Sequence, residues 1–199
     1  MAHVEYVRRE DATDHVSEIL SKWEGEGGGT ANRSLLLDAL ANHPPLLEGM
    51  YTLLDRTIRG GHLDRGLKEL VSVVVSQAND CTYCTASHRE NLMEIVAMPE
   101  ERFEAVTAGE YDALPERERA AARFTEQVAL DPKGISEEDL EALYAADFDE
   151  EDMVELLGVA GTFVAANTYV DALSIQPGDR EEAYAGAATE TSGDGDTDR

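Results

Sequence analysis

The segment from Leu63 to Ala78 decides which fold class this chain adopts. Four of its residues are valine, a type that favours β-strands. Its apolar residues nevertheless keep the spacing of one helical face over about three turns: Leu63, Leu67, Leu70, Val71 and Val74. We therefore predict a helix for this segment, and with it a fold built from helices alone.

Similar helical patterns run along most of the rest of the chain, separated by glycine and proline. Asp80 is a suitable N-cap residue for a helix that starts at Cys81. Ser136 with Asp139 is a capping signal for a later helix. In all we predict about eight helices in an all-α bundle. The others cover Asp14–Glu24, a short stretch from Leu35 that ends before Pro44, Leu46–Ile58, Cys81 to about Ala97, Glu116–Ala129, Glu137–Ala146 and about Glu150–Leu173.

A chain of 199 residues suggests one folded domain, here with an extension at each end. We expect an N-terminal helical arm with a glycine-rich joint over residues 1–29, the main domain over 30–178 and an acidic tail over 179–199. The tail is small and polar from Ala185 onwards, which is typical of disorder. The apolar face of the arm must pack on its own core or on a neighbouring subunit: Val16, Ile19, Leu20 and Trp23.

The charge of the chain excludes two classes of partner. With 16 basic residues against 42 acidic ones, the net charge is −26. Nucleic acid binding through phosphates needs a basic face, and docking on an anionic membrane needs basic residues as well. The acidic excess is typical of a surface that stays soluble at high salt, where repulsion between like charges is screened.

No secretory signal or membrane span is expected from the sequence. The first residues, MAHVEYVRRED, contain no apolar run, so we expect a cytoplasmic protein. The longest apolar region, Met153 to Ile175, is interrupted by Glu155, Asn167 and Asp171. We interpret it as a buried helix.

The two cysteines, Cys81 and Cys84, are the strongest indication of chemistry. They lie too close together in the chain to form a disulfide framework for the fold. His88 follows Cys84 by four positions, so the two should share one helix face. Glu69 precedes the break before Cys81, and an antiparallel helix hairpin would bring its carboxylate near the imidazole of His88. The expected order is therefore carboxylate, imidazole, thiol.

That order suits a thiol nucleophile. A thiol is mostly protonated at neutral pH, whereas the thiolate is the reactive form. His88 can take the proton, Glu69 can orient that imidazole or relay to it, and the second thiol can close a disulfide. The helix dipole acts most strongly on Cys81, but His88 lies nearer Cys84. We favour Cys84 as the activated thiol, with Cys81 as its partner.

Simpler interpretations remain for the same residues. Cys81, Cys84 and His88 could hold zinc with His62 or Glu69 as a fourth ligand, although no second cysteine pair is present. The cysteines could equally be two small buried side chains, and His88 a core histidine. Tyr83 is interpreted as a packing ring or a phenol donor beside a pocket.

These residues resemble the carboxymuconolactone decarboxylase-like superfamily, which includes the AhpD-like alkylhydroperoxidases. Its pattern is a glutamate, a CxxC pair and a histidine four positions later, matched here by Glu69, Cys81, Cys84 and His88. The resemblance covers roughly residues 35 to 178. Where the AhpD branch has a histidine beside the second cysteine, this chain has Tyr83, which looks more like the broad peroxidase-related branch.

The resemblance implies an all-helical homo-oligomer, a trimer or multiple of it or a dimer, without metal, flavin or other cofactor. It implies a thiol-dependent peroxidase or disulfide oxidoreductase whose redox-active disulfide is Cys81–Cys84. The expected partners are a small peroxide or disulfide substrate and a thiol electron donor. Two alternatives are a cofactor-free decarboxylase acting on a carboxylated lactone and a non-enzymatic oligomer that senses redox state.

Overall fold

In a computed structural model of the chain, residues 2–27 and 34–179 are described, and every regular element within them is a helix. The α-helices are α1 (Asp14–Gly27), α2 (Leu35–Leu40), α3 (Pro44–Leu54), α4 (Arg65–Ala78), α5 (Thr82–Ile95), α6 (Glu100–Thr107), α7 (Glu116–Leu130), α8 (Glu137–Ala145) and α9 (Glu150–Ala172). Short 3-10 helices cover Arg9–Asp11 and Tyr111–Ala113, and a π-helical turn, η3, covers Asp55–Arg59. The all-α prediction is confirmed.

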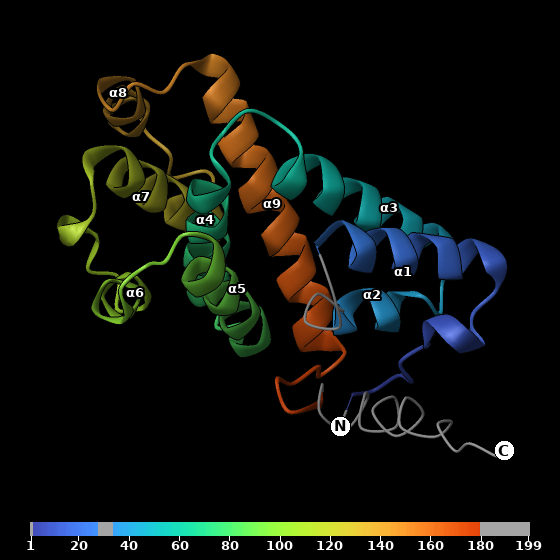
Figure 1. Cartoon of the computed structure of the whole chain (residues 1–199). Coiled ribbons are helices and arrows are strands. Elements are labelled where there is room, and N and C mark those ends of the chain that lie inside the picture. Colours follow the sequence, from blue (N-terminus) through green and yellow to red (C-terminus); the bar gives the residue numbers. More distant parts are fainter. Residues whose placement is uncertain (1, 28–33, 180–199) are drawn as a thin grey trace, which may run out of the picture.

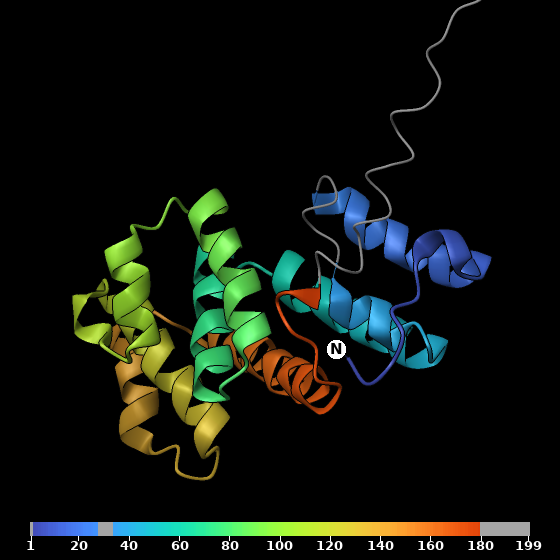
Figure 2. The ribbon, with the colours of Figure 1, turned by 90° about the horizontal axis from the view of Figure 1, so that it is seen from below.

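Helix α9 runs through the middle of the molecule (Figure 1). Helices α1, α2 and α3 lie on one side of it, and α4 to α8 lie on the other, as the view from below also shows (Figure 2). Helix α4 packs against α5, α7 and α9 at once. These contacts bury every residue from Leu67 to Ser76. The valines of α4 therefore belong to a helix that is covered on all sides, which explains its strand-like composition.

The N-terminal arm packs on the core of its own chain. Val16, Ile19 and Leu20 of α1 are buried, and α1 contacts α3. The ring of Trp23 lies edge-on to Tyr51 at 6.5 Å. The helix continues to Gly27, past its predicted end at Glu24. The rest of the predicted joint and nearly all of the predicted tail lie outside the described residues.

Helix α3 begins earlier than predicted and ends differently. It starts at Pro44, because proline at the first helical positions lacks only an amide hydrogen that would be unpaired there anyway. The side chain of His43 caps it by accepting from the amide of Leu46. At its other end the helix widens into η3 before Gly60.

Two capping boxes position the C-terminal helices. The predicted pair of Ser136 and Asp139 opens α8, and a second pair, Asp149 and Asp152, opens α9. By length and composition α9 is apolar enough to cross a membrane, a test that the core helix of a soluble protein also passes. Its residues Leu156, Val159, Ala160 and Phe163 are buried within the fold, as expected for a core helix.

Candidate functional site

A tight turn between α4 and α5 positions the first cysteine. Asp80 adopts the left-handed conformation with φ of 57°, and its amide donates to the carbonyl of Gln77. The amide of Cys81 donates to the carbonyl of Ser76, which completes a Schellman motif that closes α4. The prediction that Asp80 caps α5 is wrong, because this motif uses Asp80 and leaves Cys81 at the N-cap position.

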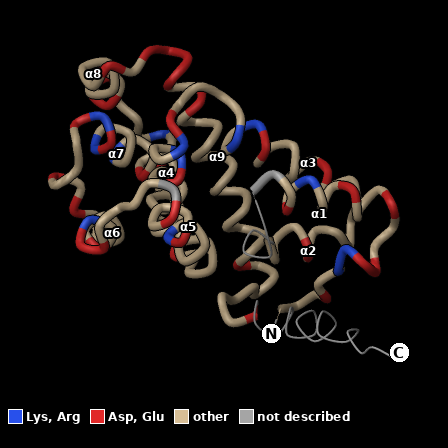
Figure 3. Tube along the Cα trace, in the orientation of Figure 1, with Lys and Arg blue, Asp and Glu red and all other residues tan. Residues whose placement is uncertain are grey.

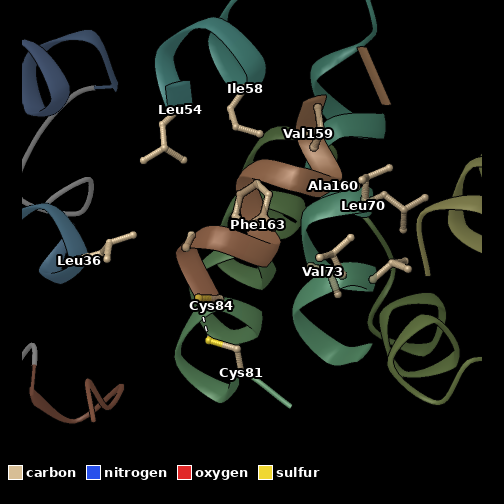
Figure 4. Close-up of a cluster of buried hydrophobic side chains, with 14 of the residues drawn as sticks. Leu36, Leu54, Ile58, Leu70, Val73, Cys81, Cys84, Val159, Ala160 and Phe163 are labelled. Atoms are coloured by element: carbon tan, nitrogen blue, oxygen red, sulfur yellow. Dashed lines mark hydrogen bonds between the residues drawn. The ribbon is translucent and has the colours of Figure 1, made fainter. Parts of the chain in front are cut away.

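The two cysteines are free thiols whose sulfur atoms face each other at 2.8 Å (Figure 4). Both are buried, with exposed fractions of 0% for Cys81 and 5% for Cys84. Phe163 of α9 belongs to the same cluster of buried side chains (Figure 4). The apolar cluster drawn around this point comes from α2, α3, η3, α4 and α9 and includes Leu36, Leu54, Ile58, Leu70, Val73, Val159 and Ala160.

Glu69 and His88 meet across the α4–α5 hairpin, as its geometry requires. Nδ1 of His88 lies 2.5 Å from Oε2 of Glu69, whose exposed fraction is 0%. Nδ2 of Asn91 donates to the same oxygen at 3.1 Å. Nε of Arg65 donates to Oε1 at 2.6 Å. The carboxylate thus accepts hydrogen bonds on both oxygens.

These partners determine the charge of Glu69. Burial raises the pKa of its carboxyl group, but the charge and hydrogen bond of His88, with Arg65 and Asn91, outweigh it and lower the pKa to about 2. Glu69 therefore stabilises the fold fully above its ordinary value of 4.5, and this contribution is lost as pH falls through about 2. At neutral pH the site contains a buried anion.

The described hydrogen bonds include none between His88 and either sulfur, so the expected chain from carboxylate to thiol is formed only in its first link. The imidazole ring instead packs edge-on against Phe163, with 4.5 Å between ring centroids. Phe163 was not identified from the sequence, and neither were Arg65 and Asn91. The four-residue spacing between Arg65 and Glu69 was a signal, but such pairs are common on solvated helix faces.

The thiol of Cys84 is held in its protonated form. Its hydrogen bond with Cys81 and its burial both raise the pKa of this thiol well above its usual range. Cys84 therefore needs a base to remove its proton during a reaction at neutral pH.

Tyr83 has a packing contact with another helix. Its ring is buried, and its hydroxyl oxygen accepts from the amide of Leu35, the first residue of α2, at 3.0 Å. Tyr83 thus connects α5 to α2.

The Tyr83→Phe variant is expected to lower the free energy of unfolding by about 1–2 kcal/mol, because it leaves the buried amide of Leu35 without its acceptor. Urea unfolding would measure the loss. Thr82→Ala, at an exposed neighbouring position, is the matched control and should change little. Equal stability of Tyr83→Phe and wild type would show that the bond contributes nothing.

Among the described residues, the group that could gather around a metal ion does not involve the cysteines. The ligand atoms of His62, Asp149 and Asp152 lie within 4.8 Å of one another. Asp152 already accepts from His62 at 2.8 Å and from Arg117 at 3.1 Å, so both of its oxygens have partners. His62, named from the sequence as a candidate zinc ligand, therefore lies with the acidic start of α9.

Comparison with known sequences matches the middle part of the chain. Residues 44–127 match the model of the carboxymuconolactone decarboxylase family, a range that contains the cysteines and Glu69. The protein YdfG of Bacillus subtilis (strain 168) is 27% identical over 113 residues, which is 55% of this chain and 76% of that protein.

Two solved structures are similar over nearly the whole chain. One is a peroxidase-related protein with an alkylhydroperoxidase AhpD core from Ralstonia eutropha JMP134, at a TM-score of 0.77 and 21% identity, covering 92% of this chain and 94% of that one. Another is a cysteine-to-alanine variant of the debrominase Bmp8 in complex with 2,3,4-tribromopyrrole, at a TM-score of 0.75 and 18% identity, covering 94% and 97%. At these identities the likeness establishes the fold.

Proposed function

The chain belongs to the carboxymuconolactone decarboxylase-like superfamily, and on that premise we propose that it is a thiol-dependent peroxidase. The observation that carries the proposal is the pair of free, buried thiols 2.8 Å apart, on the helix that also carries His88, whose imidazole pairs with the carboxylate of Glu69. Two thiols at this separation lie close to the roughly 2.0 Å of a disulfide bond. The two thiols can supply the two electrons that reduce one hydroperoxide molecule.

The first half of the reaction needs only the hydroperoxide and the two thiols. The sulfur of Cys84 attacks the terminal oxygen of a hydroperoxide as His88 takes the thiol proton, and the O–O bond breaks. His88 gives this proton to the released alkoxide, which yields an alcohol and leaves a sulfenic acid on Cys84. The thiol of Cys81 then attacks that sulfur, and water leaves as the disulfide forms. A thiol donor returns the disulfide to two thiols.

Burial explains why a base is part of this scheme. Because the pKa of the Cys84 thiol is raised, a free thiolate is scarce at neutral pH, and proton removal must accompany the attack. We place the reaction in the cytoplasm, where the reducing environment keeps such thiols available.

Treatment with one equivalent of hydrogen peroxide is expected to remove both alkylatable thiols and to lower the intact mass by that of two hydrogen atoms. Dithiothreitol should restore both thiols, since the product is a disulfide. Mass spectrometry with alkylation before and after peroxide makes the measurement. Two thiols that stay untouched by peroxide would contradict the proposal.

A cofactor-free decarboxylase is the alternative that the family name suggests. The buried pair of Glu69 and His88 favours it, because acid–base chemistry on a carboxylated lactone needs a carboxylate and an imidazole and no thiol. Turnover of such a lactone that survives alkylation of both cysteines would establish this function in place of the peroxidase.

We also propose that copies of the chain associate into a homo-oligomer. The middle of α9 carries no charged side chain (Figure 3), although the chain as a whole has 42 acidic residues against 16 basic ones. Val154 and Leu157 of α9 and Leu53 of α3 are large apolar side chains left exposed. The mass of the assembly in the reduced and oxidised states tests this, and a change between them without repeated turnover would favour a redox sensor.

A further inference from the structure

Asn167 of α9 contacts the end of α4, just before the turn that leads to Cys81. The residue is 1% exposed, and its Oδ1 accepts from the hydroxyl of Ser76 at 3.2 Å. Its Nδ2 donates to the carbonyl of Val75 at 3.5 Å. A buried amide side chain needs partners for both its oxygen and its nitrogen, so its position is defined more strictly than that of an apolar side chain. Asn167 therefore fixes the last turn of α4 against α9.

The two residues that Asn167 contacts also hold the turn itself. The carbonyl of Val75 accepts from the amide of Asn79 at 3.1 Å, and the carbonyl of Ser76 accepts from the amide of Cys81 at 2.8 Å. The second of these bonds ends on the residue that carries the first sulfur. A shift of the last turn of α4 against α9 would therefore move the backbone of Cys81.

Cys81 is the junction between the two helices. It is the N-cap residue of α5, and its carbonyl accepts from the amide of Thr85 at 3.0 Å, whereas its amide is bound to Ser76 of α4. Cys84 lies within the first turn of α5. The side chain of Cys81 points toward the sulfur of Cys84 (Figure 4). This direction depends on how α4 holds the amide of Cys81, because Cys84 is held by α5 alone.

We propose that Asn167 is a positioning residue for Cys81, which holds the end of α4 so that the two sulfurs stay within reach and the disulfide closes quickly. This inference rests on the proposed thiol chemistry. In the closing step one sulfur carries a leaving group, and the other thiol loses its proton and attacks that sulfur. The S–S bond forms as the leaving group departs with the proton, and the two thiols have lost two electrons in all. Asn167 exchanges neither protons nor electrons.

The closing step can be followed without peroxide, with 2,2′-dithiodipyridine as the oxidant. The first thiol to react forms a mixed disulfide and releases one equivalent of pyridine-2-thione, and the second thiol releases another as the protein disulfide forms. The second release therefore reports closure, whichever cysteine reacts first. Stopped-flow absorbance of the thione measures both rates. We expect Asn167→Leu to lower the ratio of the second rate to the first by about 10-fold, because the second sulfur is misplaced.

Two further variants separate positioning from a loss of stability. Ser76→Ala removes the hydroxyl that donates to Asn167 and should also lower the ratio. The double variant Ser76→Ala/Asn167→Leu leaves neither side chain without its partner, so it should regain most of the stability toward urea that Asn167→Leu loses. Its closure should nevertheless stay slow. The matched control is Thr162→Val, which removes another buried hydroxyl of α9, one that donates to the carbonyl of Gly158. It should leave the ratio unchanged.

An unchanged ratio in either Asn167→Leu or Ser76→Ala overturns the inference, even if the other variant does not fold. Closure that recovers together with stability in the double variant overturns it as well. So does a wild type that releases fewer than two equivalents of thione, because there is then no closing step to position. Failure of the proposed peroxidase function has a different signature. Peroxide would then leave the wild-type thiols untouched, while 2,2′-dithiodipyridine still closes the disulfide and the variants at Asn167 close it slowly.

Discussion

Replacing Cys84 by serine is expected to lower peroxide turnover by about 10³-fold or more, because a serine hydroxyl is far harder to ionise than a thiol and forms no sulfenic acid. Cys81→Ser should lose repeated turnover for another reason. Its Cys84 can still attack once, but the sulfenic acid then has no partner thiol 2.8 Å away. Peroxide consumption under multiple turnover measures both losses.

The two variants also differ in what they accumulate. A reagent specific for sulfenic acid should label Cys81→Ser after peroxide and leave Cys84→Ser unlabelled. The reverse labelling would assign the attack to Cys81, the sulfur at the N-cap of α5. Repeated turnover that persists in both variants would remove the cysteines from the mechanism altogether.

Local sequence patterns were sufficient to predict most of the helices, although α6 was not among them and α3 begins before its predicted start. The apolar spacing of α4 outweighed its valines, because burial on all sides makes a helix tolerant of such a composition. The pairing of Glu69 with His88 followed from the same reasoning, since a short turn between two helices leaves few other arrangements. Both results depend on residues that are neighbours along one helix or across one hairpin.

The other features of the site depend on contacts between segments that lie far apart in the sequence, which no local pattern predicts. Phe163 reaches His88 from α9, and Tyr83 reaches the amide of Leu35 in α2. Asp80 was assigned to the helix after it, whereas the chain uses it to end the helix before it. A single acidic residue between two helices suits either use, and only the hydrogen bonds of the turn distinguish them.

Lys68 shows that a basic side chain can be buried in an ion pair, which the count of charged residues does not reveal. It stands in the first turn of α4, as Arg65 does, where a cation is disfavoured by the helix dipole. Its side chain is 2% exposed and pairs with Glu155 of α9, which is 13% exposed. Its ammonium group also donates to the carbonyl of Gly60. Both cations at the start of α4 therefore compensate carboxylates that the fold covers.

The Lys68→Met variant is expected to lower the free energy of unfolding by about 3 kcal/mol, because it leaves the largely covered carboxylate of Glu155 with only the half-exposed His62 as a possible cation. The double variant Lys68→Met/Glu155→Gln should recover much of that loss. A glutamine oxygen can still accept from the amides of His62 and Leu63, which now donate to Glu155 at 3.0 and 3.3 Å. Urea unfolding of the two variants and wild type gives the comparison.

The dependence of stability on salt distinguishes the contribution of the Lys68–Glu155 pair from that of the net charge of the whole molecule. Molar potassium chloride should raise the stability of every variant, because it screens the repulsion that a net charge of −26 creates. The deficit of Lys68→Met should persist, since solvent ions do not reach a covered pair. Lys22→Met, which removes an exposed pair with Glu18, is the control and should change the stability little at any salt. A deficit of Lys68→Met that vanishes in salt would place Lys68 among the solvated charges.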